Sequence, residues 1–235
     1  MPGPVALVGA GEFTPEMLGF DAGLLATSRR SRPRVVILPT ASYPDGEEVF
    51  TRWASMGTAH FGQLGAEVEP VLLRDRSGAD DPAAVQAIGE CDLLYLSGGK
   101  PAYLMSVLEG SAVGRAIGEA HTRGAVIAGC SAGAMVLASH AFDFRFGLMP
   151  WPLRWRHGLA FVPGISVLPH YDAWPEPLSA LIALQAPRGS SVFGIDEATA
   201  VVGQDGTWQV YGRSRVTVWH GRHRDRYRAG ETFQL

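Results

Sequence analysis

The sequence has little of what marks several large classes of protein. It contains two cysteines, Cys91 and Cys130, which are too few for a disulfide framework, and neither lies in a Cys-x-x-Cys pair. No apolar run approaches the roughly 18 residues of a membrane span, and the N-terminus lacks the basic start of a signal peptide. These absences predict a soluble, cytoplasmic protein with no membrane partner.

Charged residues are also few, at 18% of the chain. The 20 Lys and Arg residues against 23 Asp and Glu residues give a net charge of −3, so no basic excess is available to bind nucleic acid. A locally basic segment, residues 220–228, is interrupted by Asp225 and is interpreted as a solvated hairpin. Its histidines, His220 and His223, have no evident third metal ligand, and we expect neither a metal nor an organic cofactor.

What the chain does contain is a regular alternation of short apolar runs with helical patterns. Continuous apolar runs are typical of strands that are covered on both faces. The expected strands are residues 5–9, 34–39, 67–73, 91–97, 125–129, 165–169 and 191–195, and the expected helices are residues 45–64, 81–88, 101–120 with a break near Gly110, and 176–185. This order predicts an α/β fold with a mostly parallel, flavodoxin-like sheet and helices on both faces.

Two segments depart from this alternation. Residues 139–164 are rich in Trp, Pro and Arg, show no clear period and are predicted to form a long loop or a short irregular excursion. From Thr199 onward the pattern becomes alternating, and Asp205 and Gly206 mark a tight turn, which predicts a C-terminal antiparallel hairpin at the edge of the sheet. With 235 residues and no internal repeat, the chain is expected to form a single domain over residues 1–235.

Residues 129–133, Gly-Cys-Ser-Ala-Gly, match the G-x-S-x-G pattern of a nucleophile elbow. A strand is expected before the pattern and a helix after it, which is the context that an elbow requires. Ser131 would then stand at the carboxyl end of the sheet, where open α/β sheets bind their ligands. The competing interpretations are small-residue packing without a nucleophile, and Cys130 as the nucleophile, although a buried cysteine more often packs as a small apolar residue.

Backbone donors for a developing oxyanion are expected on both sides of this serine. The N–H of Ala132 follows it directly, and the paired glycines in Leu-Ser-Gly-Gly-Lys, residues 96–100, leave the Gly99 N–H free to point at a substrate oxygen. A serine nucleophile also needs a base and a group that orients the base.

Among the seven histidines, His170 is the favoured base because it ends the expected strand 165–169. Three carboxylates lie near the ends of these strands, and the residues alone leave the orienting acid open among Asp172, Asp196 and Glu197. Neighbours on a strand point in opposite directions, so only one of the last two can face the imidazole.

Four segments, LYLSGGKPAYL, AGCSAGAMVL, VLPHYD and FGIDEATAVV, occur in this order and resemble the serine peptidase family that includes dipeptidase E and cyanophycinase. The resemblance extends over nearly the whole chain. It implies a class I glutamine amidotransferase-like fold and a peptidase with Ser131 as nucleophile, His170 as base and Glu197 as acid. It also implies an oxyanion hole formed by Gly99 and Ala132.

The sequence departs from the family pattern in two places. Lys100 follows the paired glycines, where dipeptidase E-like members tend to have Asn and cyanophycinase-like members Gln. No arginines directly follow His170, so the resemblance does not extend to cyanophycin as the substrate. Lys100, Arg154 and Arg156 are expected to bind a substrate carboxylate, and Asp172 is a further candidate for contact with the substrate.

The sequence therefore predicts a serine hydrolase that cleaves amide bonds of short peptides. The alternative is a catalytically inactive binding or regulatory protein on the same scaffold. A nucleotide site is disfavoured, because the G-x-G after the first expected strand lacks its third glycine and LSGGK is not a phosphate-binding loop. The side-chain preference, the role of residues 150–157 and the oligomeric state stay open, with a homodimer as one alternative.

Overall fold

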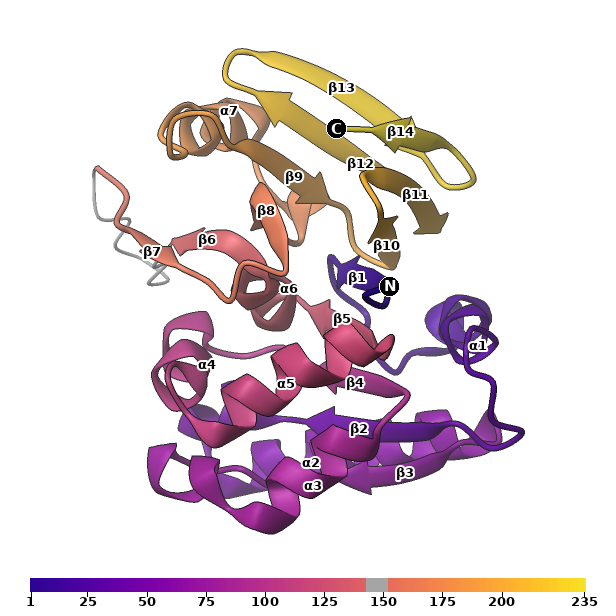
Figure 1. Cartoon of the computed structure of the whole chain (residues 1–235). Coiled ribbons are helices and arrows are strands. Elements are labelled where there is room, and N and C mark those ends of the chain that lie inside the picture. Colours follow the sequence, from indigo (N-terminus) through magenta and orange to yellow (C-terminus); the bar gives the residue numbers. More distant parts are fainter. Residues whose placement is uncertain (143–151) are drawn as a thin grey trace.

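The computed structural model describes residues 1–142 and 152–235, whose strands form two sheets (Figure 1). The first sheet has eight strands in the described chain, in the order β14 (Thr232–Gln234), β11 (Thr207–Gly212), β10 (Thr199–Gln204), β1 (Val5–Val8), β5 (Val126–Cys130), β4 (Leu93–Leu96), β2 (Arg34–Leu38) and β3 (Glu67–Pro70). The second has six, in the order β13 (His223–Arg228), β12 (Arg215–His220), β9 (Ser191–Ile195), β8 (Val162–Leu168), β6 (Ala138–Phe142) and β7 (Trp155–His157). The runs β1-β5-β4-β2-β3 and β6-β8-β9 are parallel, and the other pairs are antiparallel.

Helices cover both faces of the first sheet, which confirms the predicted α/β fold. Successive residues of a strand face opposite sides. Val36 and Leu38 of β2 accordingly pack in one apolar core, and Val35 and Ile37 in another. The first core includes residues of α3 (Pro82–Glu90), α4 (Pro101–Leu108), α5 (Ala112–Arg123), α6 (Ala132–Leu137) and α7 (Glu176–Leu184), and the second includes residues of α1 (Leu18–Leu25) and α2 (Glu47–Gln63). Because both faces are buried there, the central strands β1, β4 and β5 are buried along their whole length.

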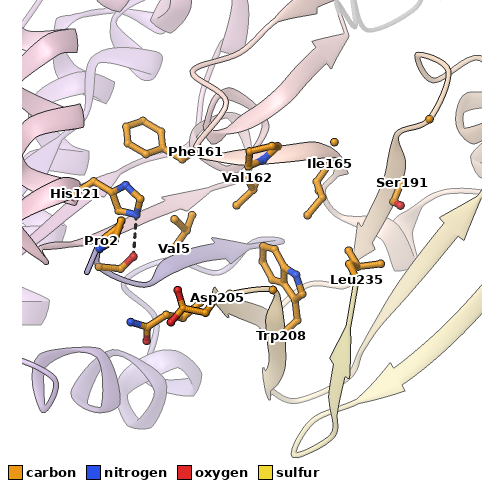
Figure 2. A pocket seen from close by; sticks show the side chains of 17 residues that line it. Pro2, Val5, His121, Phe161, Val162, Ile165, Ser191, Asp205, Trp208 and Leu235 are labelled. Carbon is orange, nitrogen blue, oxygen red and sulfur yellow. Dashed lines mark hydrogen bonds between the residues drawn. The ribbon is translucent and has the colours of Figure 1, made fainter.

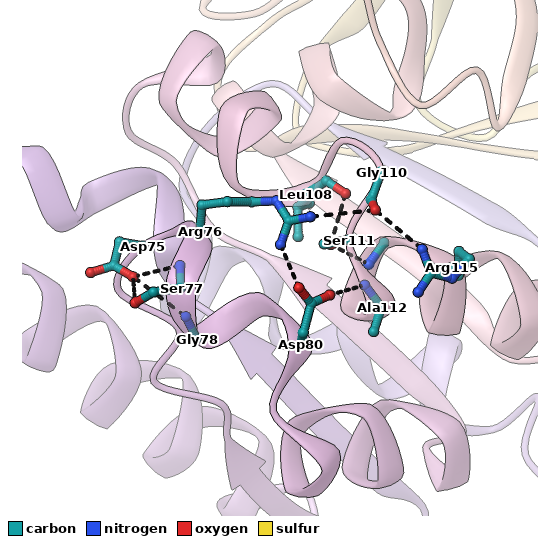
Figure 3. Close-up of polar contacts among 11 residues, drawn as sticks. Asp75, Arg76, Ser77, Gly78, Asp80, Leu108, Gly110, Ser111, Ala112 and Arg115 are labelled. Atoms are coloured by element: carbon teal, nitrogen blue, oxygen red, sulfur yellow. Dashed lines mark hydrogen bonds and ion pairs between the residues drawn. The ribbon is translucent and has the colours of Figure 1, made fainter.

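Polar side chains fix the helix ends on the side of α3 and α5. Asp80 accepts a hydrogen bond from the N–H of Ala112, at the start of α5, and pairs with Arg76 (Figure 3). Ser111 caps α5 by accepting from the N–H of Gly114 at 2.9 Å. Such caps satisfy N–H groups that have no partner within the helix. The short 3-10 helix before α3, Arg76–Asp80, is thereby joined to the helix that leads into β5.

The prediction of a long loop over residues 139–164 is wrong for much of its length. The segment contributes most of β6, all of β7 and the start of β8. Strand β7 has three residues, too few to show a period, and the second and third residues of β8 are the exposed turn formers Pro163 and Gly164. Pairing with neighbouring strands therefore decides this structure. Residues 143–151 of the predicted loop lie outside the described residues, so the role of residues 150–157 is described only from residue 152.

The C-terminal strands extend beyond the predicted hairpin and connect the two sheets. Strand β10 pairs antiparallel with β1 in the first sheet, and β12 pairs antiparallel with β9 in the second. The turn at Asp205 and Gly206 joins β10 to β11 as expected. One apolar core includes Leu7 of the first sheet and Phe193 of the second, so the sheets share buried side chains.

A cavity of about 460 Å³ lies where the first residues of β1, β8 and β9 meet (Figure 2). Its wall includes Trp208 and His121, and the Nε2–H of His121 donates to the carbonyl of Gly3 at 2.8 Å. Burial lowers the pKa of His121. None of the helices in the described residues combines the length and apolarity that crossing a membrane requires.

Candidate active site

The G-x-S-x-G segment forms a sharp turn between β5 and α6. Ser131 has φ 49° and ψ −107°, a conformation that a residue with a Cβ seldom adopts. The two glycines allow close packing, because a Cβ on Gly133 would lie 2.3 Å from the carbonyl oxygen of Leu96, and one on Gly129 would lie 2.5 Å from the Gly133 backbone. The small residues therefore do pack strand against helix, and the same packing holds Ser131 in a strained turn.

Three side chains from separate parts of the chain form a continuous set of hydrogen bonds. The Oγ of Ser131 lies 3.1 Å from Nε2 of His170, and Nδ1 of His170 lies 2.8 Å from Oε1 of Glu197. Ser131 follows β5 of the first sheet, whereas His170 and Glu197 follow β8 and β9 of the second. The carboxyl ends of parallel strands from both sheets thus meet at this point.

The geometry distinguishes the three carboxylates that the sequence left open. Asp196 is buried and has other partners: its Oδ2 accepts from the Ser214 hydroxyl at 2.6 Å and lies 3.6 Å from Nε of Arg215. Burial raises the pKa of Asp196. The Oδ1 of Asp172 accepts from the backbone N–H of Glu197 at 2.9 Å. Glu197 alone of the three contacts His170, and Asp172 holds the backbone of that glutamate.

The other histidines are engaged elsewhere. Their neighbours are Asp21 for His60, Gly3 for His121, His157 for His140, Ser191 for His220 and Asp225 for His223. His60 and Asp21 form a buried pair 2.7 Å apart between α2 and α1. Desolvation raises the pKa of Asp21. Among the described residues, no cluster of three His, Cys, Asp or Glu side chains is placed to hold a metal ion.

The paired glycines lie beside the elbow and present a free backbone donor. Gly99 has φ 142°, and a Cβ there would lie 2.2 Å from the carbonyl oxygen of Ala41, so the position requires glycine. The same carbonyl accepts from the N–H of Lys100 at 2.7 Å, which fixes the loop. Within the part of the chain that the structure describes, the N–H groups of Gly99 and Ala132 donate to no protein acceptor. Both residues line the cavity that contains Ser131.

One residue of this region, Glu12, is missed by the sequence analysis. Its side chain is buried, and it joins the glycine loop to the elbow: Oε1 accepts from the N–H of Gly98 at 2.8 Å, and Oε2 accepts from the thiol of Cys130 at 2.8 Å. Burial and the Glu12 carboxylate raise the pKa of Cys130 well above its ordinary value. Cys130 is fully buried below the turn, as the sequence analysis expected, and its thiol stays protonated. The available sequence signal was a carboxylate in the short glycine-containing loop that follows an apolar strand.

A cavity of about 670 Å³ opens beside the serine and the imidazole. Lys100 is on its wall and pairs with Asp45 through Nζ at 3.1 Å. Arg154 and Arg156, which the sequence analysis placed with Lys100, are exposed and do not line this cavity. Of the three predicted cationic contacts, Lys100 lines the cavity that contains Ser131, and the two arginines do not.

The geometry can be set beside known proteins. The Peptidase family S51 model matches residues 5–211. The uncharacterized peptidase YgaJ of Bacillus subtilis strain 168 is 29% identical over 170 residues, which cover 72% of this chain and 68% of YgaJ. Cyanophycinases of Nostoc sp. and Trichormus variabilis are each 30% identical over 165 residues, covering 67% of this chain and 55% of theirs. The chain thus spans about half the length of these two relatives.

Solved structures agree with this assignment. A crystal structure of a peptidase from an acI-B1 actinobacterium superposes with a TM-score of 0.87 at 28% identity and covers 100% of this chain and 98% of its own. A putative peptidase E protein from Listeria monocytogenes EGD-e shares the fold, with a TM-score of 0.67 at 18% identity over 91% of this chain and all of its own. The family resemblance carried by the four sequence segments is confirmed. The chain belongs to peptidase family S51 and is a serine-type peptidase.

Proposed function

We propose that the protein hydrolyses an amide bond of short peptides, with Ser131 as nucleophile, His170 as general base and acid, and Glu197 as the residue that orients the imidazole. The observation that carries the proposal is the unbroken set of contacts from the hydroxyl through both ring nitrogens to one carboxylate. This is the arrangement that activates a serine hydroxyl in unrelated folds.

The steps follow from the positions of these atoms. Ser131 Oγ attacks the carbonyl carbon of the amide while Nε2 of His170 takes its proton. The C–N bond then breaks, and the same proton moves from Nε2 to the leaving amine. A water molecule attacks the acyl-enzyme, gives a proton to Nε2 and releases the acid, and that proton returns to Ser131 Oγ. Glu197 accepts the Nδ1–H throughout, so that Nε2 is free to accept a proton, and its charge stabilises the transient imidazolium.

Backbone N–H groups are the proposed donors that stabilise the oxyanion on the substrate carbonyl. The N–H groups of Gly99 and Ala132 have no acceptor among the described residues and border the same cavity as Ser131. Donors that are fixed before the reaction stabilise charge that develops in the transition state, and one such donor contributes about 3 kcal/mol in a measured case. The Gly99 loop is held by the hydrogen bond from the Lys100 N–H to the Ala41 carbonyl, and Ala132 is held as the first residue of α6.

Lys100 is the proposed contact for the terminal carboxylate of a short peptide. Its ammonium is the Lys or Arg cation that lines the cavity within residues 1–142 and 152–235, and its partner Asp45 is itself partly exposed, so the pair can open toward a substrate. Asp172 acts on Glu197 through the backbone rather than on the substrate. We assign no role to Arg154 or Arg156.

A fluorophosphonate probe tests the nucleophile, because it labels an activated serine without requiring the right peptide. We expect the wild-type protein to be labelled at Ser131, and Ser131→Ala to lose both labelling and peptide hydrolysis. Cys130→Ala is the matched control: it removes the neighbouring thiol but keeps Ser131, so labelling at Ser131 should persist. A folded wild-type protein that is neither labelled nor hydrolytic would favour an inactive binding protein, and hydrolysis that survives Ser131→Ala would overturn the proposed nucleophile.

A further inference from the structure

The cavity beside Ser131 has a largely apolar wall built from distant parts of the chain. Met135 comes from α6, Phe142 from the end of β6, Trp174 from the loop after His170, and Leu178 from α7. Pro169, Ala173 and Pro175 contribute further apolar atoms. Peptide groups alone would not require such a wall, because a backbone is recognised by hydrogen bonds.

The apolar residues are tied to the catalytic ones. Met135 lies in the first turns of α6, directly after the elbow, and its N–H donates to the Ser131 carbonyl at 3.0 Å. The indole Nε1–H of Trp174 donates to the carbonyl of Pro169 at 3.1 Å, immediately before His170. The polar atom of Trp174 is thus used inside the protein, and its ring contributes apolar surface to the cavity.

Among the residues that the structure describes, the ionisable groups on the cavity wall are Lys100 and His170, and neither is free to hold an acidic or basic substrate side chain. His170 is committed to Ser131 and Glu197. Lys100 is 58% exposed, pairs with Asp45 and is the proposed contact for the terminal carboxylate, so it is not available to an acidic side chain. A substrate carboxylate or guanidinium placed against Met135 or Phe142 would lose its water without gaining a partner, which is costly.

We infer that this cavity binds a large apolar side chain, such as that of Leu, Met or Phe, next to the scissile amide. The inference rests on the proposed function and names its substrate class. The volume of about 670 Å³ lies in the range of sites for small ligands, so a short peptide fits with its side chain inside. Burying such a side chain in place of a methyl group is expected to raise kcat/KM about 10- to 100-fold.

The test is a panel of dipeptides X-Ala and Ala-X, in which X is Ala, Asp, Arg, Leu, Met or Phe. We expect the wild-type protein to cleave the Leu, Met and Phe members of one series about 10- to 100-fold faster than the Ala member, and the Asp and Arg members no faster than Ala. The series that shows the preference identifies the side of the amide that enters the cavity.

A pair of variants on one helix locates the preference. Leu178→Arg places a charge at the cavity, and we expect it to lower the Phe-to-Asp ratio of kcat/KM at least about tenfold. Leu181→Arg adds the same charge to α7 at an exposed position that does not line the cavity, and we expect the wild-type ratio. Leu178→Ala serves if the arginine variant does not fold, and it should reduce the apolar preference without adding a charge.

The outcomes separate this inference from the proposed function. Fluorophosphonate labelling of Ser131 together with faster cleavage of Asp or Arg dipeptides would overturn the apolar preference and leave the nucleophile in place. Equal ratios in the Leu178 and Leu181 variants would also overturn it. Absence of both labelling and hydrolysis would refute the proposed function, and the inference with it.

Discussion

Replacing Glu197 with Gln removes one charge from the proposed mechanism and little else. The amide keeps the size of the side chain and a carbonyl that can accept the Nδ1–H of His170. What is lost is the attraction between the carboxylate and the imidazolium that forms when Ser131 loses its proton. The hydrogen bond measures 2.8 Å, and the two side chains are 42% and 47% exposed, so water screens part of this attraction.

The size of the effect follows from that exposure. At about 4 Å between charge centres, the attraction is about 1 kcal/mol in bulk water and about 4 kcal/mol for a pair near a protein surface. A tenfold change in rate corresponds to about 1.4 kcal/mol. We therefore expect Glu197→Gln to lower kcat by roughly 5-fold to 10³-fold. The same substitution of a buried orienting acid would be expected to cost about 10⁴-fold.

The assay is kcat on the best dipeptide of the panel, measured on protein whose melting temperature matches the wild type. Asp196→Asn is the matched control, because this neighbouring carboxylate bonds to Ser214 and does not contact His170. We expect the control to retain the wild-type kcat. A Glu197→Gln protein with the wild-type kcat would refute the reasoning, since it would show that no charge on Glu197 stabilises the imidazolium.

Three further predictions concern the elbow, its support and pH. Gly133→Ala should lower the free energy of unfolding by about 1–3 kcal/mol in urea, because its Cβ would lie 2.3 Å from the Leu96 carbonyl oxygen; unchanged stability would contradict this close packing. Glu12→Ala leaves the Gly98 N–H and the Cys130 thiol buried without an acceptor, so we expect the free energy of unfolding to fall by about 1–3 kcal/mol. Glu12→Gln should cause a smaller decrease, and equal decreases in the two variants would argue against the two hydrogen bonds. Burial lowers the pKa of His121, so as pH falls below about 6.5 the unfolded chain binds a proton before the folded protein does, and stability is lost. His121→Gln should therefore reduce the change in the urea midpoint between pH 8 and pH 5. The same change in midpoint as in the wild type would reject this assignment.

Local patterns predicted the parts of the fold and site that depend on neighbours in sequence. Buried parallel strands are continuously apolar, so β1, β2, β4 and β5 could be recognised from the sequence. The G-x-S-x-G pattern around Ser131 could also be recognised, because it is contained in five consecutive residues. His170 was found because polar residues at the carboxyl ends of parallel strands gather at one edge of a sheet. The structure brings the two residues within hydrogen-bond distance.

The remainder depended on pairings that a sequence does not display. The choice between Asp196 and Glu197 is set by where β9 ends, and an error of one residue would reverse it. Glu12 was missed because its partners Gly98 and Cys130 are 86 and 118 positions away. The division into two sheets is decided by β10 pairing with β1 and β12 with β9, whereas each strand alone is an ordinary alternating segment.

The separation of Ser131 from His170 and Glu197 on different sheets has a practical consequence. A hydroxyl and an imidazole 3.1 Å apart tolerate little displacement, and a misplacement of 1 Å can reduce catalysis by about 10²-fold. A small shift of one sheet relative to the other would therefore abolish catalysis, although the hydrogen bonds within each sheet and the circular dichroism spectrum would stay native. The catalytic rate is therefore a more sensitive measure of how the two sheets are aligned than a spectroscopic melting curve.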